Sequence, residues 1–334
     1  MRGPNLHRTG RDSLLFLSCR GSFFLQCLHT RSKCFLAEPA WRALSRHLAN
    51  SSPRRSKLSD ATEEVFQMVV DLPEFIWKVV DYIDGPEADP TELQELIDQT
   101  HLIRANYKSF QTRIEDALEK AGMKPTKTAS PQNDKTFPIV YKYPSILVGA
   151  SYCGYWARMC TLNVLLIGLE AKLQPATASR NTASVVALNM GTGGAGRKTY
   201  LMRTIESLPH CTSPAELWTL PQADGGSKSP LILVASPRDY PTMSVEDTLK
   251  RRNSYVEENI HYARETCRSV EYMHTAAFIG PMIIVFSLRP AIKTLRSQEE
   301  KAWIMEKLGV IGKNFGIAKI EAEIYREQSG QGST

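Results

Sequence analysis

The sequence lacks the short motifs that mark most enzyme active sites and metal centres. It contains no nucleophile elbow, no HExxH zinc motif and no CxxC pair. Its histidines are scattered, without Cys, Asp or Glu partners at metal-ligand spacing on a common helix face. Paired carboxylates fall on amphipathic segments, where a solvated helix face explains them. The sequence therefore predicts no enzymatic activity, no catalytic or metal-binding residue and no cofactor.

Cysteine is present, but its number and spacing do not suit disulfides. The chain has seven, at positions 19, 27, 34, 153, 160, 211 and 267. Cys153 and Cys160 would lie on one helix face about 10 Å apart along the axis, which is too far for a disulfide. We expect small buried thiols in a reducing compartment.

The first 58 residues are nearly free of acidic side chains. They hold nine Arg and two Lys against Asp12 and Glu38, a charge of +9, whereas the whole chain carries +6, so the remaining residues carry −3. The basic charge therefore belongs to an N-terminal arm and not to the body of the protein. We expect residues 1–57 to form a disordered basic arm or a mis-predicted exon. The same Arg- and Ser-rich composition also fits a mitochondrial transit peptide.

One long apolar stretch, Tyr143–Leu173, has no broad polar face. Pro144 suits the first turn of a helix, because that N–H would be unpaired in any case. A helix that is apolar nearly all round lies inside a protein or inside a membrane. Arg158 stands near the middle, where a charge would cost about 2.5–3.5 kcal/mol in a membrane span. We therefore expect a buried central helix over 143–173 and no membrane contact.

Arg158 needs a partner of its own in this helix. A charge in an apolar environment must be paired or must reach a surface. A salt bridge with an acidic residue of another helix is the favoured interpretation. Binding of an effector molecule is the alternative.

Helical patterns on both sides of this stretch predict an all-α domain over 58–329. The clearest start is at Asp89, which can cap a helix that Pro90 opens, and Gly122 is the expected left-handed end. Thr100 and Arg104 interrupt the apolar face of this helix, which argues against a coiled-coil dimer. Apolar spacing places further helices at 58–84, 244–274, 297–311 and 315–325. The apolar residues 282–288 predict a short buried helix or an extended segment.

Three segments are expected to lack regular structure. Residues 122–136 form a polar linker, residues 174–243 a long flexible insertion rich in Gly, Ser, Thr and Pro, and residues 330–334 a disordered tail. Within the insertion, Gly191–Thr199 matches the loose GxGxxG spacing of nucleotide-binding loops. No acidic residue follows at the ribose-binding distance, and Arg197 separates the last glycine from the lysine that a phosphate loop requires. We interpret it as a flexible loop, with a nucleotide site as the alternative.

Two blocks of aromatic, aliphatic and charged residues carry a family resemblance. The first runs from Phe137-Pro138 through Tyr143-Pro144-Ser145 and Tyr155-Trp156-Ala157 to Leu165-Leu166, and the second from Ala263-Arg264 through Cys267–Tyr272, Gly280-Pro281 and Phe286–Ala291 to Trp303. Together they resemble the C-terminal part of the regulatory domain of fungal-specific transcription factors of the zinc binuclear cluster class. Cys34–Trp41 resembles the segment that these proteins often carry just before that region. The resemblance implies an all-α regulatory fold, residence in the nucleus and control of transcription, often over secondary metabolism.

The chain departs from this family in its cysteines. The family's DNA-binding module holds two zinc ions with six cysteines, whereas only Cys27 and Cys34 stand at a matching spacing here. Four of the six ligands are missing, so a folded zinc cluster is excluded.

The sequence thus favours a transcription regulator of this family without its own DNA-binding module. It would act through other transcription factors or coregulators, or be the product of a truncated gene model. DNA contact would be indirect or non-specific, and a small-molecule effector remains open as a partner. A mitochondrial helical protein with an N-terminal transit peptide is the alternative.

Overall fold

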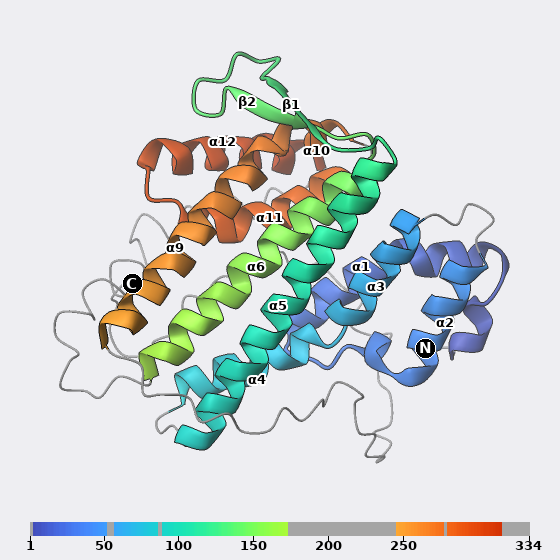
Figure 1. The fold of residues 1–334 in the computed structure, drawn as a ribbon. Coiled ribbons are helices and arrows are strands. Elements are labelled where there is room, and N and C mark those ends of the chain that lie inside the picture. Colours follow the sequence, from blue (N-terminus) through green and yellow to red (C-terminus); the bar gives the residue numbers. More distant parts are fainter. Residues whose placement is uncertain (1–2, 52–56, 86–88, 173–244, 277–278, 316–334) are drawn as a thin grey trace, which may run out of the picture.

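The computed structural model describes residues 3–51, 57–85, 89–172, 245–276 and 279–315 of the 334-residue chain. Within these ranges the protein is almost entirely helical, with one small two-stranded sheet, so the predicted all-α fold is confirmed (Figure 1). The α-helices are α1 (Gly10–Thr30), α2 (Pro39–Asn50), α3 (Lys57–Val69), α4 (Leu72–Asp84), α5 (Pro90–Lys120), α6 (Ile146–Lys172), α9 (Val245–Arg268), α10 (Val270–Thr275), α11 (Ile279–Thr294) and α12 (Gln298–Phe315). Short 3₁₀ turns stand at Pro4–His7 and Phe35–Ala37.

Helix α6 is the centre of the fold. It packs against α5, α9, α11 and α4, and Figure 1 shows it flanked by α5 on one side and α9 on the other. Apolar side chains all round the helix are fully buried, including Met159, Leu162 and Leu166. The predicted buried central helix is therefore confirmed, with its first residue at Ile146 instead of Tyr143.

Two glycines of α6 allow neighbouring side chains to come close. A Cβ atom at Gly149 would stand 2.6 Å from Sδ of Met273, and one at Gly168 would stand 2.7 Å from Cδ1 of Ile83. At its C-terminal end α6 is tied to α9 by an ion pair between Glu170 and Arg251, with Oε1 and Nε 2.7 Å apart. Small residues and buried charges thus fix the neighbours of α6.

Helix α5 begins and ends as its sequence signals predicted. The Asp89 carboxylate accepts a hydrogen bond from the Thr91 backbone N–H at 2.9 Å, and Pro90 occupies the first helical position. Beyond the other end Gly122 has a φ of +64°, in the left-handed region that glycine adopts at low cost. Thr100 is buried, and its hydroxyl donates to the Leu96 carbonyl at 2.6 Å.

The expectation of a disordered N-terminal arm needs correction. Helices α1 and α2 cover most of it, and with the turn at Phe35–Ala37 they form a second hydrophobic cluster of their own. Its buried members are Phe16, Cys27, Cys34, Leu36, Trp41, Leu44, Leu48 and Val70. The arm's basic charge is partly neutralised, because Arg20 pairs with Glu63 of α3 and Arg42 pairs with Asp71 beside α4. These acidic partners are distant in sequence, so composition alone could not reveal them.

The predicted polar linker at 122–136 also differs. Strand β1 (Thr126–Ala129) pairs antiparallel with β2 (Ile139–Lys142), Thr126 lying opposite Lys142. The hairpin is fixed to α9, because the Tyr141 hydroxyl and the Lys127 ammonium both contact the buried carboxylate of Glu265. Both strands are short and mostly exposed, so neither shows clear apolar alternation.

The C-terminal region follows the predicted helices with shifted ends. The apolar segment at 282–288 belongs to the longer helix α11, and Pro281 lies in the first turn of this helix. The insertion at 174–243, the glycine-rich Gly191–Thr199, the helix predicted at 315–325 and the tail at 330–334 lie outside the described residues, apart from Phe315. Across the described ranges, no helix is both long enough and apolar enough to cross a membrane.

Candidate functional site: a cavity between α1, α3, α5 and α6

A cavity of about 360 Å³ lies where the N-terminal helices meet the central pair α5 and α6. This volume falls at the lower end of the range of small-molecule sites. Each of these helices contributes one face, with residues three or four positions apart, as helical geometry requires. The wall consists of Leu17, Arg20, Gly21 and Phe24 of α1; Thr62, Val65, Phe66 and Val69 of α3; Tyr107, Phe110, Gln111 and Ile114 of α5; Ile146, Leu147, Ala150, Ser151, Tyr155 and Arg158 of α6; and Ile283 of α11.

Arg158 is the most unusual residue of this wall. Its Nε atom is buried without a hydrogen-bond partner. The guanidinium lies 5.3 Å from the centroid of the Tyr107 ring, a cation–π distance, and no described carboxylate forms an ion pair with it. Burial lowers the pKa of Arg158 from its ordinary value. The salt bridge favoured from the sequence is therefore not found within the described part of the chain.

Gly154, one turn before Arg158, makes room for this guanidinium. A Cβ atom at Gly154 would stand 3.0 Å from Nη1 and 3.1 Å from Nη2 of Arg158. The arginine therefore folds back along α6 over the glycine, beside the cavity that it lines. A side chain at position 154 would require the guanidinium to shift by a few tenths of an ångström.

Tyr107 supplies a second buried polar group to the same wall. The residue is 1% exposed and its hydroxyl has no hydrogen-bond partner. Burial raises the pKa of Tyr107 to about 12, so the phenol keeps its proton near neutral pH and remains a donor. An unsatisfied buried hydroxyl costs about 1–3 kcal/mol.

Arg20, the other charged residue of the wall, is already paired. Its Nη1 donates to the Ser45 hydroxyl at 2.7 Å and to the Glu63 carboxylate, and the guanidinium stacks 4.2 Å from the Phe66 ring centroid. No acidic side chain is among the described residues that line the cavity. The cavity is thus apolar, with one unneutralised positive charge at Arg158.

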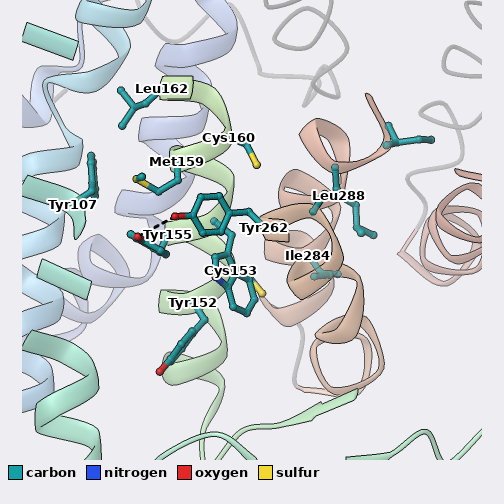
Figure 2. Packing of buried hydrophobic residues seen from close by; sticks show 14 of the residues in the cluster. Tyr107, Tyr152, Cys153, Tyr155, Met159, Cys160, Leu162, Tyr262, Ile284 and Leu288 are labelled. Carbon is teal, nitrogen blue, oxygen red and sulfur yellow. Dashed lines mark hydrogen bonds between the residues drawn. The ribbon is translucent and has the colours of Figure 1, made fainter. Parts of the chain in front are cut away.

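Tyr155 connects the cavity to the core between α6 and α9. Figure 2 shows its ring facing Tyr262 of α9, with Met159 and Cys160 further along α6. The two tyrosine hydroxyls are 3.5 Å apart, and the Tyr262 hydroxyl donates to Oε1 of Glu258 at 3.1 Å. A change at the cavity wall can therefore reach α9 through two tyrosines.

Glu258 is the centre of a polar network that joins α5, α6 and α9. Lys108 lies 2.7 Å from Oε1, the Asn163 amide donates to Oε2 at 2.8 Å, and Arg104 also pairs with the carboxylate. Nε of Arg104 additionally donates to the Asn163 side-chain carbonyl at 2.7 Å. Burial would raise the pKa of Glu258, but the hydrogen bonds from Lys108, Asn163 and Arg104 prevail and lower it to about 2. Arg104 interrupts the apolar face of α5 because its guanidinium takes part in this polar network.

Five of the six described cysteines are buried, as the sequence predicted, whereas Cys19 is half-buried and Cys211 lies outside the described residues. Cys153, Cys160 and Cys267 are free and buried in the main core, and burial raises the pKa of each thiol. Cys27 and Cys34 lie together in the second cluster, where a hydrogen bond from Cys34 lowers the pKa of Cys27 to about 7 against the effect of burial. Within the ranges the structure covers, no three His, Cys, Asp or Glu side chains are grouped so as to hold a metal ion.

Sequence reasoning found Arg158 but missed the cavity and Tyr107. Tyr107 stands at an apolar-face position of α5, and nothing in its spacing distinguishes a core tyrosine from one whose hydroxyl lacks a partner. The cavity needs faces from helices more than 100 residues apart, which no local pattern records.

Comparison with known proteins leaves the family of the chain open. No protein-family profile matches it, and no solved structure matches it. An uncharacterized protein from Emericella nidulans is 24% identical over 190 residues, which are 54% of this chain and 39% of that protein. The chain therefore spans about two fifths of the length of this relative, and its similarity is to a protein whose own function is not assigned.

Proposed function

We propose that the chain is a transcription regulator without its own DNA-binding module, whose helical body responds to a small-molecule effector. The observation that carries the effector role is the cavity between α1, α3, α5 and α6, with its apolar wall and two unsatisfied donors. The transcriptional role rests on the sequence resemblance of the α6 and α9 blocks to fungal regulatory domains. A helical scaffold with an internal apolar site suits a domain that changes its contacts when a ligand binds.

The route from effector to output would be the tyrosine pair and the Glu258 network. Tyr155 lines the cavity, and its hydroxyl reaches Glu258 through Tyr262. A ligand that displaces the Tyr155 ring would alter the contact between α6 and α9, and partner proteins that bind this region would sense the change. Coupling of this kind needs only a ligand that binds one arrangement better than the other.

The N-terminal arm would act as part of the regulatory body and not as a DNA-binding tail. Three of its arginines form ion pairs with the body: Arg20 with Glu63, Arg31 with Asp81 and Arg42 with Asp71. Charges neutralised in this way are not available to phosphates. Attraction to DNA would therefore be weak, non-specific and strongly dependent on salt.

A tethering experiment tests the function. The full chain is fused to an unrelated DNA-binding domain in a fungal reporter strain, and reporter output is compared with that of the DNA-binding domain alone. We expect the fusion to change reporter output. Ala150→Phe fills the cavity, so its reporter output should either equal that of the DNA-binding domain alone or no longer respond to the effector. Ala105→Phe, an equal enlargement on the exposed face of α5, is the matched control and should behave as the unmodified fusion. A well-expressed fusion without effect on output would refute the proposal.

The mitochondrial alternative makes a different prediction about the N-terminus. Cleavage near residue 50 would remove α1 and α2, the second hydrophobic cluster and one wall of the cavity. We therefore favour retention of the arm and nuclear residence. Imaging of a C-terminally tagged protein should show nuclear fluorescence and an intact N-terminus. Mitochondrial fluorescence with a shortened N-terminus would establish the alternative.

A further inference from the structure

We infer that the cavity binds a small apolar monocarboxylate, whose carboxylate pairs with Arg158 while its hydrocarbon part fills the apolar space. The inference rests on the proposed effector function and adds to it the chemical class of the ligand. The charge of the wall and the buried groups that lack partners determine that class.

Charge is the first argument. Arg158 is a partly buried cation, because its Nε is shielded from solvent while the residue as a whole keeps some exposure. A partly buried charge without a partner is unfavourable, and proteins normally pair such groups or bind a counter-ion. Among the charged residues of the cavity wall, Arg20 is neutralised by Glu63, whereas no described carboxylate pairs with Arg158. A ligand with one negative charge would complete the electrostatics of the site. A neutral ligand would leave Arg158 as it is, and a cationic one would be repelled.

Hydrogen bonding is the second argument, and it is independent of charge. Nε of Arg158 and the hydroxyl of Tyr107 are both buried donors without acceptors. The two side chains are neighbours, since the guanidinium lies 5.3 Å from the centroid of the Tyr107 ring. A carboxylate has two oxygens and accepts several hydrogen bonds, and guanidinium–carboxylate pairs are among the strong ones in proteins.

The remainder of the wall defines the rest of the ligand. Apart from Arg20, Arg158, Tyr107 and a few hydroxyl or amide side chains, the lining is aliphatic or aromatic. Such a surface offers few partners for a sugar, a nucleotide or a peptide backbone, most of whose polar groups would be left without hydrogen bonds. Hydrocarbon chains or aromatic rings carrying one acid group fit this division between a polar end and an apolar end.

Calorimetry with matched probes tests the inference on the purified full chain. The probes are decanoate, decanol and decylamine at concentrations below those at which they form micelles. We expect decanoate to bind at least about tenfold more tightly than decanol, because only decanoate makes a charge-assisted pair. Decylamine should not bind. Arg158→Met should lower the affinity for decanoate about tenfold or more and change that for decanol little. Arg158→Lys, which keeps the charge, should retain part of the decanoate affinity.

Arg113→Met is the matched control. Arg113 lies on α5, where it is exposed and pairs with Glu64 of α3 at 2.7 Å. Its removal should therefore change neither the affinity for decanoate nor that for decanol. Arg158→Met with unchanged decanoate binding would overturn the inference, as would equal binding of decanoate and decanol. If decanoate and decanol bind equally well to the wild-type chain and neither binds to Ala150→Phe, the cavity remains an effector site and only the assignment of an acidic ligand fails. Absence of all binding also overturns the acid assignment, whereas the tethered reporter judges the transcriptional role separately.

Discussion

Replacing Glu258 by Gln should make the protein less stable at neutral pH. The difference in the free energy of unfolding between the variant and the wild-type protein should become smaller in acid. The carboxylate accepts hydrogen bonds from Lys108, Asn163 and Arg104, and these lower its pKa from 4.5 to about 2. Its side chain is 20% exposed, so solvent weakens these interactions only in part. A group whose pKa is lower in the folded state stabilises that state fully above its unfolded pKa. The contribution is lost as the pH falls from about 4.5 through about 2.

The magnitude follows from the two pKa values. The difference between 4.5 and about 2, at about 1.4 kcal/mol for each pH unit, gives about 3 kcal/mol at pH 7. Near pH 3 the same linkage leaves about 1 kcal/mol, because the carboxylate is then largely protonated in the unfolded chain. The stability difference between wild type and Glu258→Gln should therefore shrink by about 2 kcal/mol between pH 7 and pH 3.

Urea unfolding followed by circular dichroism measures this difference at both pH values. Glu257→Gln is the matched control, because Glu257 is the adjacent residue on α9 but its side chain is 67% exposed and forms an ion pair with the exposed Arg296. It should change stability by less than about 0.5 kcal/mol at either pH. A stability difference for Glu258→Gln that is the same at pH 7 and pH 3 would refute the assignment of Glu258 as an ionised centre of the network.

Four further substitutions test the fold by thermal melting or urea unfolding. Gly280→Ala should lower the melting temperature strongly, because a Cβ atom there would stand 2.2 Å from the backbone oxygen of Met273. Gly21→Ala is its control: a Cβ atom there would have nothing within 4 Å, so the change should be neutral or stabilising by up to about 1 kcal/mol. Leu166 is fully buried in α6, so Leu166→Ala should cost about 2–5 kcal/mol, and an unchanged melting temperature would place this residue outside the core. Asp89→Ala removes the cap of α5 and should cost about 1 kcal/mol, measured by urea unfolding; no loss would mean that the backbone N–H groups find water instead.

The central helix and α5 were predictable because their signals are local. A long, largely apolar stretch after Pro144 predicts burial wherever its neighbours come from. The Asp89-Pro90 start needs only a side-chain oxygen and a fixed φ angle. In both cases the structure agrees to within a few residues. The N-terminal arm folds against acidic partners such as Glu63 and Asp71, which lie outside it in the sequence. The net charge of the arm alone does not include these partners and therefore predicted disorder.

The candidate site could be predicted only in part. Arg158 stood out from the sequence because it is the one charge in the middle of an apolar helix, and this anomaly does lie at the cavity. The interpretation as a salt bridge assumed that an acidic residue would be near, which the described helices do not provide. Tyr107 and the cavity itself arise from the relative placement of α1, α3, α5 and α6, and sequence periodicity carries no information on that placement.

Amide hydrogen exchange of the full chain with and without decanoate tests most directly that the cavity between α1, α3, α5 and α6 is the effector site. Binding there should slow exchange in the segments that line it, 17–24, 62–69, 107–114 and 146–158, and leave α12 unchanged. The effect should be absent in Ala150→Phe. Slower exchange confined to α12 or to the hairpin, or the same protection in Ala150→Phe as in the wild-type chain, would contradict the account.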